Sequence, residues 1–326
     1  MRLAPISTVG DSERGRAALA LLLTADPFLA HMDAVGAFEQ DTMAFNWRPD
    51  TATATLQGRD LGGAYTPADQ TPAALQTAEQ ALMGDSIKSD IALIRDQELG
   101  GNKMELWFDK RLRTRFTDWA EKLGVRLWQG SGTGAPRQMK GLLKIYDGTA
   151  DLPGFTGEKG VLEAHTMAGV ANSLDVTAEA NWDDFIRVMI SAMAKVKNPT
   201  AICCNKELYS LITIIAHEKH IKGESRDQFG NPVTTFNNVP IICLADGCIT
   251  NTEPDAAGSP VNNTTSLFIS GLAEGRGAVV TNSGLYFNEQ KRPGTDQIEL
   301  IDWEFRGEWK FEDKRAMRRI RRIKAV

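Results

Sequence analysis

The chain has 326 residues, 42% of them hydrophobic and 24% charged, which is the composition of a globular protein with room for about two domains. Its formal net charge of −5 excludes a basic nucleic-acid coat, because the protein as a whole would repel polyphosphate. No apolar run approaches the roughly 20 residues that cross a bilayer, so we expect no membrane partner.

The first hundred residues contain two stretches with few apolar anchors. Residues 1–45 begin polar and continue as Ala/Leu-rich turns broken at Pro27, which predicts an arm with a short helix. Residues 46–98 are rich in Thr, Ala, Gln, Gly and Asp, and a connection of this length is uncommon inside a compact domain. We therefore expect an excursion that becomes ordered by lying on another surface.

A single long amphipathic helix is expected over residues 103–128, because apolar residues recur every three or four positions. At 1.5 Å per residue it would span about 37 Å. It ends in a glycine-rich break at residues 130–136. The apolar stripe of this helix consists of Met104, Phe108, Leu112, Phe116, Trp119, Leu123 and Leu127.

A mixed α/β region follows, in which Asn181 and Asn205 stand where they would cap helices. Short apolar runs between Gly-, Asn- and Pro-rich turns predict buried strands. The expected helices cover residues 182–196 and 206–219, and the expected strands cover 200–204, 239–244, 266–270 and 278–281.

The C-terminal region carries the strongest strand pattern, an alternation of apolar and charged residues over residues 301–312. One face should be buried and the other wet, and Gly307 is expected to mark a bend or bulge. Residues 314–324 then hold seven basic residues. Pairing with the acidic stretch before them, within or between subunits, is a simpler interpretation than contact with DNA phosphates.

The motifs that suggest enzyme chemistry are weak. The G-x-G-x-G string at residues 130–134 closes a helix, whereas a nucleotide-binding loop opens one. His217 and His220 are three residues apart, not the four of a zinc helix, so a solvated helix end is favoured. We expect no catalytic residue, metal or cofactor. Four cysteines are expected to be reduced core thiols: Cys203, Cys204, Cys243 and Cys248.

The order of these elements resembles the major capsid protein of tailed bacteriophages, of the Hong Kong 97 type. The most specific pieces are residues 127–132 continuing to 140–142, residues 279–306, and Asp302-Trp303-Glu304-Phe305-Arg306 followed by Ala316. The resemblance implies an α+β fold with five parts: an N-terminal arm (1–45), an extended loop (46–98), a peripheral domain (99–180) with the spine helix 103–128, an axial domain (181–292), and a return to the peripheral domain (293–326) with the C-terminal end back in the axial domain.

The same resemblance implies a shell protein that assembles in the host cytoplasm into the icosahedral head of a virion. The shell would enclose packaged double-stranded DNA without sequence-specific binding. The implied partners are copies of the chain in hexameric and pentameric capsomers, portal and scaffolding proteins, and a cementing or decoration protein. The candidate intersubunit contacts are Arg48, Arg59, Asp302, Glu304, Arg306 and Glu308.

Some members of that family join neighbouring subunits by a bond between a loop lysine and an asparagine. This chain has no lysine before Lys88, so residues 46–87 offer only Arg48 and Arg59, and a guanidinium cannot replace the amine. We therefore expect a non-covalent shell.

Two alternatives stay open. An encapsulin-like nanocompartment resembles the same fold but encloses cargo enzymes, and its contents would distinguish it from a phage head. A soluble metal- or nucleotide-dependent enzyme built on residues 182–290 would persist as a monomer or dimer instead of forming shells.

Overall fold

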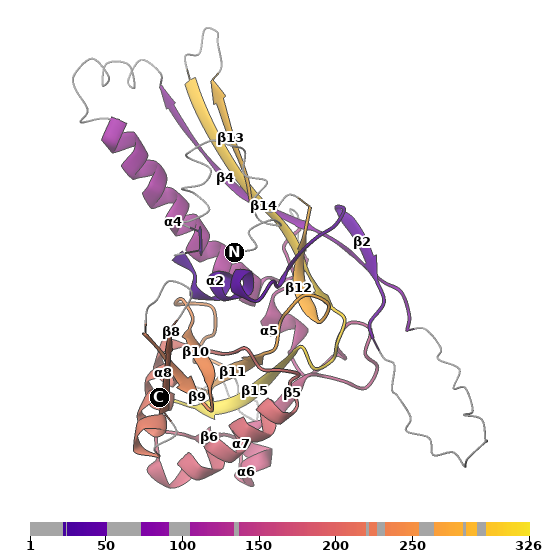
Figure 1. Ribbon diagram of the computed structural model, residues 1–326, viewed down its shortest axis with the longest axis vertical. Coiled ribbons are helices and arrows are strands. Elements are labelled where there is room, and N and C mark those ends of the chain that lie inside the picture. Colours follow the sequence, from indigo (N-terminus) through magenta and orange to yellow (C-terminus); the bar gives the residue numbers. More distant parts are fainter. Residues whose placement is uncertain are drawn as a thin grey trace, which may run out of the picture.

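The computed structural model describes residues 22–23, 25–50, 73–90, 105–133, 137–219, 222–226, 232–253, 264–282, 285–291 and 298–326. Most of the predicted extended loop, at residues 51–72 and 91–98, lies outside this description, as do Arg59 and Met104. Figure 1 shows a long helix beside a group of long strands in one half of the molecule, and a second sheet with shorter helices in the other half.

The described part of the N-terminal arm is a core element. The helical residues before Asp26 end there and helix α2 (Pro27–Ala34) begins at Pro27, so the expected break is confirmed: proline fits the first helical turn, where its missing N–H needs no partner. Phe28, Leu29 and Met32 are buried in the main hydrophobic core. The arm then continues as β1 (Phe38–Gln40), which pairs in parallel with β12 (Gly277–Thr281).

The long helix is confirmed as α4 (Glu105–Gln129), 25 residues long. Its stripe faces the core, with Leu112, Phe116, Trp119, Leu123 and Leu127 buried. Phe108 lies in α4, but its side chain is outside the description. Phe116 meets Trp303 of the long strand edge-on, with ring centroids 5.7 Å apart. The stripe therefore fixes the helix along the strand.

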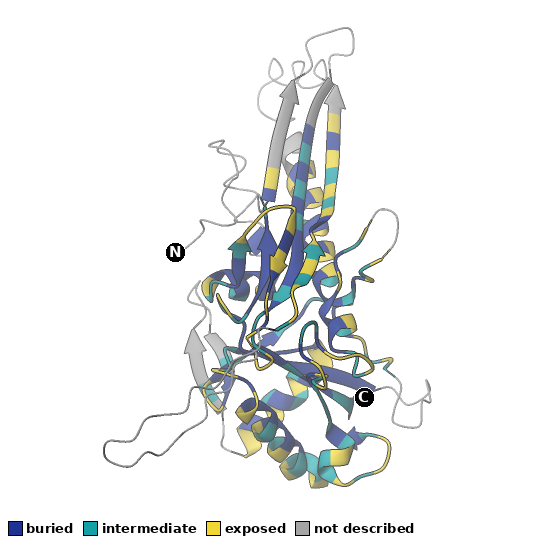
Figure 2. Ribbon diagram, turned by 90° about the vertical axis from the view of Figure 1, so that its right-hand side faces the viewer, coloured by how far each residue is buried: buried dark blue, intermediate teal, exposed yellow. Residues whose placement is uncertain are grey.

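The long strands form a five-stranded sheet around β14 (Ile298–Phe311). This strand pairs on one side with β13 (Leu285–Lys291) and on the other with β4 (Ala81–Asp90) and then β12. In Figure 2 the described parts of the long strands carry buried and exposed residues in alternation. Residues 81–90, part of the predicted loop range, are thus a strand of this sheet.

Of the bend or bulge expected at Gly307, the strand pairing shows no bulge. In β14, Gly307 pairs with Ala81 of β4, and the next residue, Glu308, pairs with Val280 of β12. No extra residue is inserted at this point. A Cβ at residue 307 would lie 2.8 Å from Phe305 Cε1 and 2.9 Å from Val279 Cγ1. The glycine therefore marks the exchange of partner strand, where no side chain fits.

The second sheet has eight strands in the order β5-β15-β11-β7-β10-β9-β8, with β6 also paired to β15. The last strand of the chain lies inside this sheet, so the C-terminal end returns to it. The strands are β5 (Val161–Glu163), β6 (Leu174–Asp175), β7 (Ala201–Cys204), β8 (Lys222–Arg226), β9 (Pro232–Phe236), β10 (Val239–Cys243), β11 (Thr264–Ser270) and β15 (Met317–Lys324).

Three helices accompany the second sheet: α6 (Ala164–Ala168), α7 (Trp182–Ala194) and α8 (Lys206–Glu218). Their apolar residues share a second core with β7, β11 and β15. Asn205 caps α8 as expected, accepting a hydrogen bond from the Leu208 amide at 3.1 Å. Asn181 precedes α7 but its side chain donates to the Asp175 carbonyl at 2.7 Å, so its predicted capping role is wrong.

Three small elements complete the described structure. Strands β2 (Ala44–Trp47) and β3 (Gln76–Glu79) form an antiparallel ribbon, α5 (Leu142–Ile145) is one helical turn, and η1 (Glu179–Asn181) is a 3₁₀ turn before α7. Among the described residues, no helix combines the length and the apolar character needed to span a membrane.

Candidate functional site

The turn after α4 requires glycine at two positions. The Gly141 amide donates to the Gly130 carbonyl at 2.8 Å, which brings the chain back across the end of the helix. A Cβ at Gly130 would collide with the Met139 carbonyl, and a Cβ at Gly141 with the Trp128 carbonyl. The helix ends at the glycine-rich segment, as the sequence predicted, and the structure adds that Gly130 and Gly141 leave no room for side chains in the turn.

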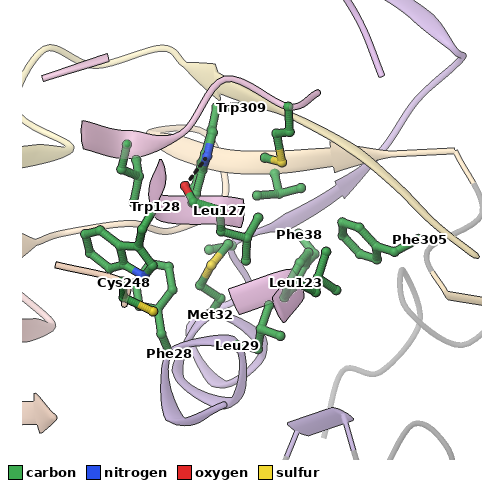
Figure 3. Packing of buried hydrophobic residues seen from close by; sticks show 14 of the residues in the cluster. Phe28, Leu29, Met32, Phe38, Leu123, Leu127, Trp128, Cys248, Phe305 and Trp309 are labelled. Atoms are coloured by element: carbon green, nitrogen blue, oxygen red, sulfur yellow. Dashed lines mark hydrogen bonds between the residues drawn. The ribbon is translucent and has the colours of Figure 1, made fainter. Parts of the chain in front are cut away.

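The base of α4 is the meeting point of distant segments. Figure 3 shows Trp128 against Phe28 of α2, and the ring centroids are 4.8 Å apart. Trp128 also meets Phe268 of β11 at 4.9 Å, and the Trp309 indole N–H donates to the Leu127 carbonyl at 3.4 Å. The helix, both sheets and the N-terminal segment are thus joined in one core.

The sheet formed by β4, β14 and β13 has an outer face, directed away from the residues that pack on α4, on which the candidate contacts Asp302, Glu304 and Arg306 lie. All three are partly exposed, and Glu304 and Arg306 form an ion pair within the strand. Their outward direction follows from the alternation along β14, because Ile301, Trp303 and Phe305 are buried.

Three large apolar side chains share this face, and the sequence analysis missed them. Tyr286 lies opposite Glu304 in the register and Leu82 lies opposite Arg306, whose guanidinium is 3.9 Å from the Met43 sulfur. Met43, Leu82 and Tyr286 are 39%, 48% and 43% exposed. We call Met43, Leu82, Tyr286, Glu304 and Arg306 the arm face. Strand register brings Leu82 and Tyr286 to this face, and the contact with Arg306 places Met43 beside them.

Glu308, a fourth candidate contact, is not on a wet face. It is 5% exposed, and one carboxylate oxygen accepts the amides of Lys140 at 3.2 Å and Trp309 at 3.1 Å. Arg137 approaches the other oxygen at 3.7 Å. Burial raises the pKa of Glu308 to about 7. The expectation of a solvated side chain is wrong because the loop after α4 covers this end of β14.

Of the two candidate contact arginines in the predicted loop, the structure describes one. Arg48 is exposed just after β2, and Arg59 lies outside the described residues. Around Arg48 the chain is held in place, because the Trp47 indole N–H donates to the Phe311 carbonyl at 3.0 Å and the Asp50 amide donates to the Glu312 carbonyl at 2.6 Å. These two hydrogen bonds hold this end of the ribbon beside the end of β14.

The basic C-terminal run is paired within the chain, largely with acids other than the preceding stretch. Arg319 is 5% exposed and forms an ion pair with Glu253, and its guanidinium donates to the Tyr146 carbonyl at 2.8 Å. Burial lowers the pKa of Arg319. The remaining pairs are Lys314 and Arg318 with Glu158, Arg315 with Asp313, Arg321 and Arg322 with Glu163, and Lys324 with Asp175.

The residues that could suggest enzyme chemistry are the two neighbouring histidines and the four cysteines. His217 is exposed in the last turn of α8, and His220 lies outside the described residues. In the part of the chain that the structure describes, no three His, Cys, Asp or Glu side chains gather as metal ligands. The four cysteines are free thiols, and burial raises the pKa of Cys203, Cys204 and Cys248.

The chain is similar to known proteins in its structure. No protein-family model and no curated protein matches the sequence. The SrpI encapsulin of Synechococcus elongatus PCC 7942 superposes with a TM-score of 0.57 at 11% identity, covering 90% of this chain and 88% of that chain. The capsid protein of the native GTA particle gives 0.55 at 13%, covering 90% and 89%. The procapsid of satellite phage P4 gives 0.51 at 10%, covering 95% and 99%. The chain therefore has the α+β capsid fold of the Hong Kong 97 type.

Proposed function

We propose that this chain is the subunit of a closed protein shell, and specifically the major capsid protein of a tailed-phage head that encloses double-stranded DNA. The observation that carries the proposal is the fold, which matches shell proteins over nearly the whole chain. Copies of the chain in capsomers are the main partners. Portal, scaffolding and cementing proteins are further partners of such a head, and the virion capsid is the corresponding location.

The arm face supports a role in assembly. Helix α4 covers the inner face of the β4–β14–β13 sheet, while the outer face presents Met43, Leu82 and Tyr286 around the Glu304–Arg306 pair. Neighbouring apolar side chains of this size on one surface typically mark an interaction site. An ion pair at the centre of such a surface restricts which partner fits it.

The charge distribution supports an interior that does not hold DNA tightly. The seven basic residues of 314–324 are all engaged by acids of the same chain, and the formal net charge is −5. Strong binding to phosphates requires unpaired Lys and Arg side chains that displace counterions. A lining of this composition lets DNA move during packaging.

Assembly is tested on the purified full chain by sedimentation velocity and electron microscopy. Capsomers and closed shells are the expected products, and a persistent monomer or dimer contradicts the proposal. Leu82→Glu should reduce assembly while leaving the subunit folded, because Leu82 is exposed. Ile190→Glu is the matched control: Ile190 is 49% exposed on α7, away from the arm face, and the substitution should have less effect.

An encapsulin-like compartment is the second candidate, favoured by the superposition on SrpI. The two are distinguished by what particles from the native host contain. Double-stranded DNA protected from nuclease supports the phage head, whereas a co-purified enzyme without DNA supports the compartment. A soluble enzyme is the third candidate, and it predicts neither shells nor contents.

A further inference from the structure

The β2–β3 ribbon is attached to the body of the subunit at both of its ends. It forms a two-stranded sheet of its own, separate from the five-stranded and eight-stranded sheets. Phe45 and Trp47 pack with Val280 in a small cluster distinct from both large cores. Because this cluster is small, polar contacts at the two ends of the ribbon also fix its position.

The inner end of the ribbon is fixed by Gln80, which lies between β3 and β4. Its side chain is 4% exposed and accepts the Asn282 amide at 2.8 Å while donating to the Thr42 carbonyl at 3.1 Å. Its own amide donates to the Met43 carbonyl at 2.9 Å. At the other end of the ribbon, the Trp47 indole N–H donates to the Phe311 carbonyl at 3.0 Å and the Asp50 amide donates to the Glu312 carbonyl at 2.6 Å.

A further attachment is made by the loop after α4. Arg137, in the loop after α4, contacts Glu79 of β3 at 2.9 Å with one terminal nitrogen and Glu308 of β14 at 3.7 Å with the other. Glu79 and Arg137 are largely exposed and contribute little by themselves. Glu308 is buried, so its charge decides how firmly Arg137 is held to the body.

The charged groups around Glu308 come from four elements. Arg137 and Lys140 approach it from the loop after α4, and Glu79 of β3 reaches it only through Arg137. On β14 itself, Lys310 is already bound to Glu39 of β1 at 2.8 Å and to Glu312 at 2.7 Å. Arg137 is thus the side chain that connects the charge of Glu308 to the ribbon.

We propose that Glu79, Arg137 and Glu308 form a proton-dependent tether, which holds the β2–β3 ribbon against the base of α4 when Glu308 is ionised and loosens it when Glu308 is protonated. Burial places the pKa of Glu308 at about 7, so the change falls between about pH 6 and pH 8. The tether lies within one subunit, so it can be measured whether or not the chain forms shells.

The test is amide hydrogen exchange of residues 44–47 and 76–80 in the full chain, corrected for the intrinsic pH dependence of exchange. Ribbon opening should be about three- to tenfold more frequent at pH 6 than at pH 8, as expected for losing one ion pair. Glu308→Gln should open at the pH 6 level at both pH values. Arg137→Met should do the same, because it keeps a long side chain without the charge.

Glu163→Gln is the matched control, since Glu163 is an ion-paired carboxylate of the other sheet, 3.1 Å from Arg322. This variant should keep the pH response of the wild type. Global unfolding gives the opposite trend, because a folded-state pKa above the ordinary value of 4.5 makes the fold less stable as pH rises through about 7. Equal ribbon opening at pH 6 and pH 8, or an unchanged response in Glu308→Gln or Arg137→Met, overturns the tether.

Discussion

The carboxylate of Asp26 occupies the space that a side chain on Gly124 would need. A Cβ at residue 124 would collide with Asp26 Oδ2, so this glycine, near the C-terminal end of the spine helix, allows the N-cap of α2 to lie directly against α4. Asp26 Oδ1 accepts the Phe28 amide at 2.8 Å, whereas Oδ2 is buried without a hydrogen-bond partner. This contact joins the N-terminal segment to the spine.

Gly124→Ala should therefore destabilise the protein, although alanine favours an isolated helix by about 1 kcal/mol. Overpacking against Asp26 should cost about 1–3 kcal/mol, measured as the free energy of unfolding in urea. Asp26→Ser keeps a capping oxygen in a smaller side chain. Adding Asp26→Ser to Gly124→Ala should recover part of the loss, and a purely additive double variant would exclude this contact as the cause.

Asp26 should also make stability depend on pH. Burial raises its pKa to about 6 from an ordinary 3.8, so ionisation costs stability as pH rises through about 6, and the cost disappears below about pH 4. Asp26→Asn keeps the capping oxygen without the charge. It should be more stable than the wild type by about 3 kcal/mol at pH 8, with the difference vanishing near pH 4. A constant difference across this range would contradict the assignment.

The spine stripe should matter more for stability than the exposed charges of the same helix. Phe116 is 1% exposed and packs on Trp119 and Trp303 with ring centroids 5.3 and 5.7 Å away. Phe116→Ala should cost roughly 3–5 kcal/mol, whereas Arg113→Ala on the exposed side should cost well under about 1. Soluble yield and urea midpoints of both variants provide the measurement, and equal losses would count against the packing described for α4.

The Arg319–Glu253 pair should behave as a buried ion pair. Arg319→Met leaves the Glu253 carboxylate, which is only 11% exposed, without its cation and should cost about 3–5 kcal/mol. Adding Glu253→Gln removes the stranded charge and should restore much of that loss. Thermal unfolding of the two single variants and the double variant measures the coupling, which is predicted to be large; near-additive effects would falsify it.

The assembled shell should be held together without covalent bonds. Residues 46–87 contain no lysine, and Lys88 lies exposed on β4, opposite Leu300 of β14. Without an amine in the loop, an isopeptide bond from it cannot form. Particles boiled in detergent should run as one band near 35.7 kDa on a denaturing gel. A ladder of multimers would contradict this expectation.

The sequence alone determined the elements whose pattern is local. The stripe from Leu112 to Leu127 predicted α4, the alternation from Ile301 to Phe311 predicted β14, and Asn205 predicted the start of α8. These features depend on periods of 3.6 and 2 residues and on one capping side chain, all of which can be read within a few turns of chain. Their order was enough to predict the fold.

Only the tertiary structure decided which surfaces those elements bury. In the sequence, Glu308 is one of several charged residues that alternate with apolar ones. In the structure, the loop after α4 covers it. In the sequence, Gly124 only lowers the helix propensity of this segment. The structure shows that Asp26, almost a hundred residues earlier, lies against it. Leu82 and Tyr286 come to lie on one face only through strand register. Such contacts join segments distant in sequence, and local periodicity carries no information about which segments meet.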